Sequence, residues 1–147
     1  MQITSRFTVA VHIIAAVDYF KDALNVTSTF LAGSIGVNPV IVRNVMLSLK
    51  EAGIISVNRG KSGIVLTKTL NEITFFDIYR AVECVNDEGL FHFHERPNMA
   101  CPVGRSIHAA LDGRLKRIQE CMEAEMKTIT VADVVEDIRS AAGADNK

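Results

Sequence analysis

The sequence predicts a mainly α-helical protein with one small β-hairpin, organised as a winged helix-turn-helix domain followed by a long C-terminal dimerisation helix. Three observations carry this prediction. A short helix, a glycine-containing turn and a second helix fit residues 28–52, two β-branched runs flank a basic turn within residues 54–67, and apolar residues recur at helical spacing over 107–126. The expected divisions are a winged domain at 1–85, a sensor-type loop at 86–101, and the dimerisation helix with a short terminal helix at 102–147.

The first two helices are marked by hydroxyl side chains that can cap their starts. Thr4 or Ser5 can cap a helix that runs to about Phe20. Ser28 is expected to cap a second, short helix that ends before Gly36. The glycine then belongs to the turn of the helix-turn-helix.

A third helix is marked at both ends. Asn38 is a good N-cap, Pro39 suits the first helical position, and Gly53 stands where a left-handed cap follows a helix ending near Ala52. One stripe of this helix is apolar and should be buried: Val42, Val45, Met46 and Leu49. The other face should point outward and presents Asn38, Val40, Arg43, Asn44, Leu47 and Lys50.

A hairpin and three more helices follow. Residues 54–58 and 64–67 are β-branched strands around a basic tip, Arg59-Gly60-Lys61-Ser62-Gly63. Thr74 and Asp77 have the spacing of a capping box and open a helix that reaches about Cys84. Pro102 opens the longest helix, to about Thr128, and Thr130 with Asp133 caps a last helix to about Ala141.

Charge is unevenly divided along a chain whose net charge is −1. Residues 1–72 carry seven Lys/Arg and four Asp/Glu, a balance of +3, whereas residues 73–147 carry nine and thirteen, a balance of −4. Between residues 28 and 68 there are five Lys/Arg against the single acid Glu51. The first half can therefore meet phosphate, which the second half would repel.

The cysteines and the apolar start of the chain bear on location. Cys84, Cys101 and Cys121 are widely and unequally spaced, which is not a disulfide framework and favours a reducing compartment, the cytoplasm. The apolar run after Arg6 resembles a signal peptide, but His12 interrupts it and Asp18 closes it. The run is also shorter than the roughly 20 residues that a bilayer span needs, so no membrane partner is expected.

The order of elements points to double-stranded DNA as the partner. A recognition helix enters the major groove and reads base edges, while the wing lies along the backbone or minor groove. Arg43 can pair with guanine and Asn44 with adenine, and Ser28 and Asn38, at helix starts, suit phosphate. The expected DNA-binding residues are Ser28, Asn38, Pro39, Val40, Arg43, Asn44, Arg59, Gly60, Lys61 and Ser62. The alternative is that these polar residues only form the solvent-exposed face of a helix and contact no DNA.

These segments together resemble the Rrf-two (BadM-like) family of bacterial winged-helix transcription regulators, in its YwnA-like branch. The resemblance covers nearly the whole chain and is carried by residues 5–12 (SRFTVAVH), 38–40 (NPV), 49–55 (LKEAGII), 59–60 (RG), 74–83 (TFFDIYRAVE) and 101–104 (CPVG). It implies a homodimer in which the long helix packs against its partner's copy, so that two wings reach one palindromic operator.

The cofactor pattern of the family's best-known members is missing. Those members hold an iron–sulfur cluster through three closely spaced cysteines in the loop before the long helix, where this chain has only Cys101. No cofactor is therefore expected. Cys101 is either a thiol sensor, because a helix start lowers a thiol pKa, or a packed cysteine without further role. His92 and His94 could bind zinc with Cys101, or face water while Phe91 and Phe93 plug the core.

The long helix has its own two interpretations. Its apolar stripe is either a dimer seam or a face folded back on its own domain, and the seam is favoured because a winged domain offers little surface for so long a stripe. The expected seam residues are Ile107, Leu111, Leu115, Ile118 and Met122.

The function expected from all of this is sequence-specific DNA binding for transcriptional control, as a repressor, with a redox signal through Cys101 or a small-molecule effector. No nucleophile with a partner and no phosphate-cradling glycine loop is found, so the chain is not expected to be an enzyme. The rival is a winged-helix module that docks proteins and does not bind DNA.

Overall fold

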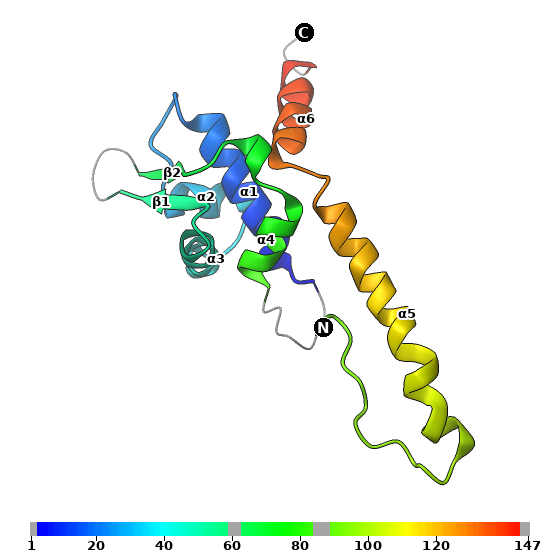
Figure 1. The fold of residues 1–147 in the computed structure, drawn as a ribbon. Helices are drawn as coiled ribbons and strands as arrows, with labels where there is room; N and C mark the ends of the chain where they lie inside the picture. Colours follow the sequence, from blue (N-terminus) through cyan, green and yellow to red (C-terminus); the bar gives the residue numbers. More distant parts are fainter. Residues whose placement is uncertain (1–2, 59–62, 84–88, 145–147) are drawn as a thin grey trace.

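The computed structural model describes residues 3–58, 63–83 and 89–144. It confirms a mainly helical chain with one antiparallel hairpin (Figure 1). The elements in chain order are α1 Ser5–Phe20, α2 Ser28–Ile35, α3 Pro39–Glu51, β1 Ile55–Val57, β2 Ile64–Leu66, the 3₁₀ turn η1 Leu70–Glu72, α4 Phe75–Val82, α5 Pro102–Met126 and α6 Val131–Ala144.

Helices α1–α4 and α6 and the hairpin pack together into what we call the body, and α1 lies at its centre. It is apolar nearly all round, and α2, α3, α4, α6 and β2 all pack against it. Ile13 and Ile14 are fully buried there, together with Leu49 of α3 and Tyr79 of α4. The Thr4 side chain accepts a hydrogen bond from the backbone N–H of Arg6 and caps the helix, as the sequence predicts.

Two capping boxes fix the starts of α4 and α6. The Thr74 backbone N–H and hydroxyl both donate to the Asp77 carboxylate, at 2.9 and 2.8 Å. The same arrangement joins Thr130 to Asp133, at 2.8 and 2.9 Å. Both starts lie where the sequence predicts them. The observed ends differ from the predicted ones by up to about a turn: α4 stops at Val82 and α6 continues to Ala144.

The hairpin pairs Ile55 with Leu66, Ser56 with Val65 and Val57 with Ile64. Gly63 closes its described end in a left-handed conformation, with φ of +54°. A Cβ at this position would lie 2.8 Å from the carbonyl oxygen of Val26, so the wing at Gly63 packs closely against the loop before α2. The predicted tip residues Arg59, Gly60, Lys61 and Ser62 lie outside the described residues.

Residues 89–126 form an arm that projects from the body (Figure 1). Residues 89–101 have no regular structure and lead outward beside α5, which runs back toward α6; the Leu90 backbone N–H donates to Oε1 of Gln119 at 2.9 Å. The prediction that Phe91 and Phe93 plug the core is therefore wrong. Phe91 is half-buried and Phe93 is 38% exposed, and both lie against α5, because the segment follows α5 instead of crossing the body.

The end of α5 is fastened to the body by backbone pairing. The Phe75 N–H donates to the Ile129 carbonyl at 2.9 Å, and the Val131 N–H donates to the Ile73 carbonyl at 3.0 Å. Within the described residues, no single helix combines the length and apolar composition of a bilayer span. Helices α2 and α3 reach those limits only together, across a bend of 114°.

Candidate nucleic-acid interface

The turn between α2 and α3 has the geometry of a helix-turn-helix. Gly36 ends α2 with φ of +77°, and its N–H donates to the Ala32 carbonyl at 2.9 Å. Asn38 then caps α3, its Oδ1 accepting from the Val40 N–H at 2.8 Å. Two residues therefore separate a left-handed helix end from the next helix start.

One predicted cap is off by a residue. Thr27, not Ser28, caps α2, accepting from the Phe30 N–H at 3.2 Å. Ser28 is the first residue of the helix and is half-buried. The prediction that Ser28 caps α2 is therefore wrong, whereas its contact with a DNA phosphate stays a prediction.

Helix α3 divides into a buried and an exposed face as the sequence predicts. Val42, Val45 and Leu49 are fully buried and Met46 is 9% exposed. We call the opposite side the reading face. Its apolar members are widely exposed, Val40 at 53% and Leu47 at 55%, and its polar members are also exposed: Asn38, Arg43, Asn44 and Lys50. Helix α3 is thus not a core helix, and Arg43 and Asn44 point away from the body.

Arg6 holds α3 in place, a role that the sequence does not reveal. Its Nε donates to the Val82 carbonyl at 3.1 Å, and its Nη2 donates to the Ser48 hydroxyl at 3.1 Å. One side chain of α1 thus ties α3 to the end of α4. One signal in the sequence could have revealed this role. Arg6 lies in the first turn of α1, where the helix dipole disfavours a positive charge, so its guanidinium needs a partner that offsets this effect.

Glu83 completes this junction. Its side chain is among the few buried charged groups, and Oε1 accepts from both the N–H and the hydroxyl of Thr4, at 2.9 and 3.0 Å. The start of α1 is therefore bound to the residue that precedes the undescribed segment 84–88.

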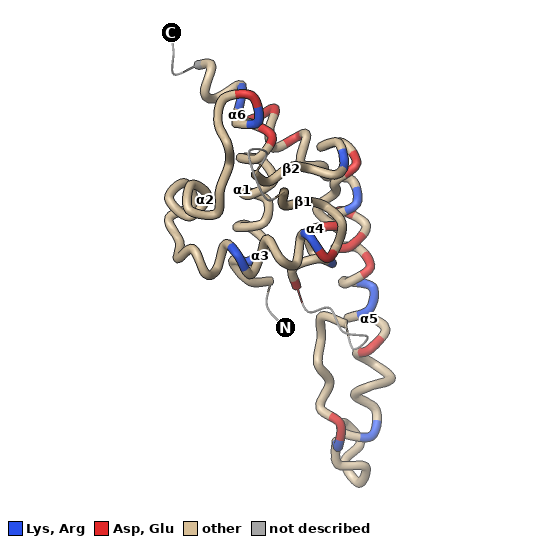
Figure 2. The backbone as a smooth tube through the Cα atoms, turned by 90° about the vertical axis from the view of Figure 1, so that its left-hand side faces the viewer, with Lys and Arg blue, Asp and Glu red and all other residues tan. Residues whose placement is uncertain are grey.

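Positive charge on the reading face comes from Arg43 and Lys50 of α3, both exposed. Figure 2 shows a basic segment of α3 on the side of the body away from α5, along which acidic and basic segments alternate. Arg59 and Lys61 would add to this charge from the wing, but they fall outside the described residues.

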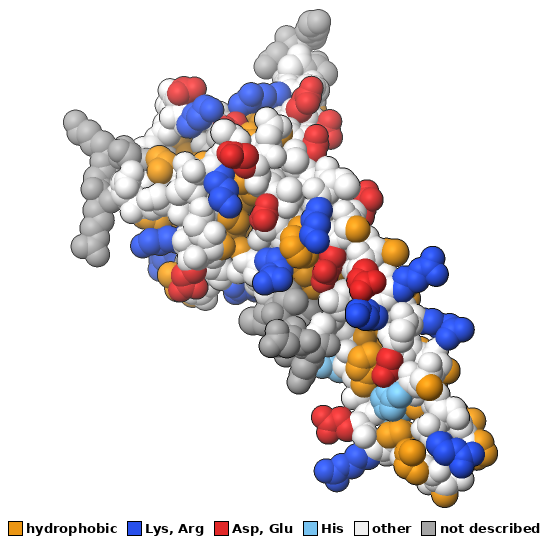
Figure 3. Space-filling model, viewed as in Figure 1, with side chains coloured by type: hydrophobic (Ala, Val, Ile, Leu, Met, Phe, Trp, Pro, Cys, Tyr) orange, Lys and Arg blue, Asp and Glu red, His pale blue; other side chains and the backbone are white. Residues whose placement is uncertain are grey.

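The predicted seam residues lie along the arm. No described residue of α5 is buried, which is unusual for a helix of 25 residues. Ile118 is 56% exposed, and Ile107, Leu111 and Leu115 are half-buried. Met122 differs from the others because it packs against the core of its own domain. Hydrophobic side chains also gather at the far end of the arm (Figure 3), where Met99 is 63% and Val103 is 70% exposed.

Cys101 is the N-cap residue of α5 and is half-buried. The neighbouring backbone N–H groups of Gly104 and Val103, at the start of α5, lower the pKa of its thiol. Gly104 is required here, since a Cβ would meet the backbone of Asn98, whose carbonyl also accepts from the Cys101 N–H at 3.1 Å. A tight backbone turn therefore joins Asn98 to the start of α5.

Two histidines of the arm, His94 and His108, contact each other. The ring of His108 stacks on His94 at 5.2 Å, and its Nε2 lies 3.0 Å from the His94 carbonyl oxygen. Its Nδ1 lies 3.1 Å from the Asp112 carboxylate. Within the described residues, no three His, Cys, Asp or Glu side chains lie close enough to hold a metal ion.

Solved structures share this fold over most of the chain. A crystal structure described as a DNA binding protein is 33% identical, with a TM-score of 0.69 over 88% of this chain and 98% of that one. A transcriptional regulator from Lactobacillus plantarum has a TM-score of 0.74 at 24% identity, over 99% of this chain and 100% of that one. The cysteine regulator CymR of Bacillus subtilis, at 17% identity, has a TM-score of 0.67 over 92% and 97% of the two chains. The last two likenesses concern the fold alone.

Sequence comparison adds the family. YwnA of Bacillus subtilis, named as an HTH-type transcriptional regulator, is 37% identical over 133 residues, which are 90% of this chain and 96% of YwnA. YffB of Lactococcus lactis, named likewise, is 21% identical over 93% of this chain and 88% of its own. The model of the Rrf2 family, described as an iron-dependent transcriptional regulator, matches residues 3–137. The chain therefore belongs to the Rrf2 family of transcriptional regulators.

Proposed function

We propose that this protein is a sequence-specific DNA-binding transcriptional regulator of the bacterial cytoplasm, acting as a homodimeric repressor on a palindromic operator. The observation that carries the proposal is the reading face of α3, which is exposed along its length and carries Arg43 and Asn44 at its centre. YwnA, which is similar over nearly its whole length, is named as a regulator of the same kind.

The reading face suits a major groove chemically. Arg43 can donate two hydrogen bonds to guanine, and Asn44 can pair with the edge of adenine. The exposed side chains of Val40 and Leu47, which would be costly on a purely solvated helix, suit contact with thymine methyl groups. Lys50, exposed near the end of α3, can neutralise a phosphate beside the groove, and the predicted wing contacts are Arg59, Gly60, Lys61 and Ser62.

Dimerisation is supported by the arm. A monomer leaves the apolar stripe of α5 without a single buried residue, although Ile107, Leu111, Leu115 and Ile118 recur at helical spacing. Helix-to-helix packing with a second copy would remove that stripe from water at about 25 cal/mol per Å². Met122 is not a suitable position for testing the seam by mutation, because it packs against the core of its own domain.

Cys101 is the proposed redox-sensing residue. Its lowered pKa raises the thiolate fraction at neutral pH, and the thiolate is the form that oxidants attack. Oxidation would place a bulky, charged group at the start of α5, beside the proposed seam. The test is operator binding before and after peroxide treatment, and a Cys101→Ser protein that responds as the wild type does would exclude this role.

The described residues do not fit the iron that the family description names. Cys101 caps α5 and Cys121 lies on the same helix twenty residues later, a separation of about 30 Å along the axis. These two sulfurs cannot share a cluster. Cys84 lies outside the described residues. The proposed mechanism therefore uses no iron–sulfur group.

A competition gel shift tests the DNA-binding proposal. The full-length protein is titrated into labelled DNA from upstream of its own gene, with either the same unlabelled DNA or a shuffled duplex as competitor. We expect the same-sequence competitor to displace the complex at a concentration at least a hundredfold lower. Equal displacement by both duplexes, or no complex at all, would favour the rival role of a protein-docking module.

A further inference from the structure

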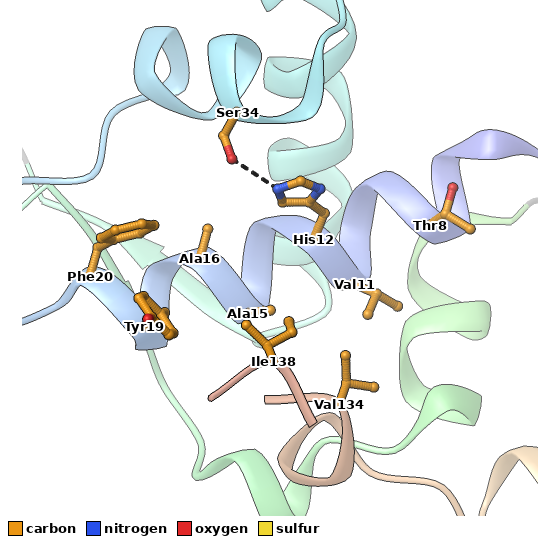
Figure 4. Close-up of a pocket in the computed structure, with 10 residues that line it drawn as sticks. All are labelled: Thr8, Val11, His12, Ala15, Ala16, Tyr19, Phe20, Ser34, Val134 and Ile138. Carbon is orange, nitrogen blue, oxygen red and sulfur yellow. Dashed lines mark hydrogen bonds between the residues drawn. The ribbon is translucent and has the colours of Figure 1, made fainter. Parts of the chain in front are cut away.

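A pocket of about 400 Å³ opens between α1 and α6, with the end of α2 closing one side (Figure 4). This volume lies within the range of small-molecule sites. The pocket is outside the reading face and outside the arm. Its walls are formed by Thr8, Val11, His12, Ala15, Ala16, Tyr19, Phe20, Ser34, Val134 and Ile138.

The chemistry of these walls selects the ligand. None of the lining side chains is a carboxylate, an ammonium or a guanidinium group, and the lining is mostly carbon. An ionised ligand would lose hydration that no carboxylate, ammonium or guanidinium group of this lining replaces. Ala15 and Ala16 leave the floor open because their side chains are short, and Tyr19 with Phe20 places aromatic rings at one end. These walls favour an uncharged, mainly apolar occupant.

One corner of the pocket is polar. His12 of α1 and Ser34 of α2 face each other there, with Nε2 of the imidazole 3.0 Å from the serine Oγ (Figure 4). A serine hydroxyl can rotate to donate or accept, and a neutral imidazole has one donor and one acceptor nitrogen. This pair can therefore meet a single hydroxyl or carbonyl group on an otherwise apolar molecule.

The α6 wall is held by specific contacts, so the pocket exists before a ligand arrives. The Arg139 guanidinium pairs with the Asp18 carboxylate of α1 at 2.9 Å, and the Thr130 capping box fixes the start of α6. Val134 and Ile138 project from α6 toward α1 between these two fastenings (Figure 4). A preformed pocket avoids the free-energy cost of ordering its walls on binding.

The polar corner is also next to the DNA-reading unit. Ser34 lies two residues before Gly36, the left-handed residue that sets the angle between α2 and α3. Helix α2 in turn packs against α3. A molecule that competes for the His12–Ser34 hydrogen bond thus acts on the element that orients Arg43.

From these observations we infer that the pocket is an effector site for a small, uncharged, mainly apolar molecule, of the phenol or aromatic carbonyl class, whose polar group binds at His12 and Ser34. The ligand site stands independently of DNA binding, whereas its role as an effector rests on the proposed function. Binding there and binding at the operator are expected to be coupled.

The first arm of the test measures binding without DNA. The full-length protein is titrated with 2-naphthol, which is uncharged at pH 7 and carries one hydroxyl, and its fluorescence is followed. We expect one site per chain with a Kd below about 100 µM, as the size of the probe allows. Naphthalene-2-sulfonate, the same ring system with a permanent charge, should bind at least about tenfold more weakly.

Variants assign the signal to the pocket. Val134→Phe fills it and should weaken 2-naphthol at least about tenfold, and Ser34→Ala should weaken it about fivefold by removing one hydrogen-bond partner. Val57→Phe, the same change at an exposed strand position outside the pocket, should leave the Kd unchanged. Equal Kd values for wild type and Val134→Phe would overturn the site. So would a Kd that rises with protein concentration, because a second copy would then fill the groove.

The second arm measures coupling. The Kd of 2-naphthol is determined again with a saturating duplex from the protein's own promoter, and we expect a change of at least about threefold in either direction. An unchanged Kd would overturn the effector role. Failure of the protein to bind the duplex would count against the proposed function instead, and the first arm would still decide the ligand site.

Discussion

Arg6 and Ser48 lie 42 positions apart in the sequence, yet a hydrogen bond of 3.1 Å joins the Arg6 guanidinium to the Ser48 hydroxyl. The same guanidinium donates to the Val82 carbonyl at 3.1 Å. The position of α3, and with it the reading face, therefore depends on Arg6, a side chain that is not part of that face.

Replacing Arg6 by Met should destabilise the fold and weaken DNA binding together. The change removes both hydrogen bonds and leaves the Val82 carbonyl without this donor, so we expect a loss of about 1–3 kcal/mol in the free energy of unfolding. Urea denaturation measures it. Arg96→Met, at an exposed position on the arm, is the matched control and should be close to neutral. Equal losses in the two variants would contradict the assigned role.

Two glycines with positive φ should respond differently to alanine. Gly63→Ala combines strain at φ of +54° with a close approach to the Val26 carbonyl, whereas Gly53→Ala, at φ of +70°, meets no atom within 4 Å. We expect about 1 kcal/mol of destabilisation for Gly53→Ala and clearly more for Gly63→Ala. Thermal or urea unfolding ranks the two, and the reverse order would mean that the wing does not press on the loop before α2.

Leu115→Glu and Ile118→Glu should yield monomers. Each places a carboxylate in the proposed seam, and Ile118 is 56% exposed in a single chain, so its replacement should not harm the monomer fold. Sedimentation equilibrium gives the mass, and circular dichroism reports on the fold. Lys116→Glu, exposed on the same helix, is the control and should remain dimeric. A dimeric Ile118→Glu protein would place the seam elsewhere.

Cys101 should react with iodoacetamide at lower pH in the folded protein than in the urea-unfolded chain. The Gly104 and Val103 N–H groups lower its pKa in the folded state, so the thiolate appears earlier on raising the pH. By linkage, its contribution to stability is present above the unfolded pKa and is lost as the pH falls through the folded pKa. A protein with serine at positions 84 and 121 isolates the signal, and identical midpoints in the two states would refute the prediction.

The starts of the helices could be predicted from the sequence because their signals are local. Thr74 with Asp77 forms one predicted capping box, and Thr130 with Asp133 forms the other. Each box lies within four consecutive residues. The cap of α2 shows the limit of this reasoning. Thr27 and Ser28 are adjacent hydroxyl residues, and only the three-dimensional path of the chain decides which one reaches the Phe30 N–H.

The features that the sequence did not reveal depend on contacts between distant segments. The path of Phe91 and Phe93 is set by the packing of residues 89–101 along α5, which no local period encodes. The tie from Arg6 to Ser48, and the pocket between α1 and α6, likewise appear only when the helices are packed. The reading face could be predicted because a helix separates its buried and exposed residues by a fixed period.

Helix α3 is proposed to present Arg43 and its neighbours to a duplex in an electrostatic setting that favours phosphate. Fluorescence anisotropy against the protein's own promoter DNA, between about 50 and 200 mM salt, tests it most directly for the wild type and Arg43→Ala. We expect the affinity of the wild type to fall steeply with salt, and Arg43→Ala to bind at least about tenfold more weakly to the promoter but nearly normally to shuffled DNA. Affinities that are independent of salt, or equal for the two proteins on the promoter, would mean that α3 does not read DNA through Arg43.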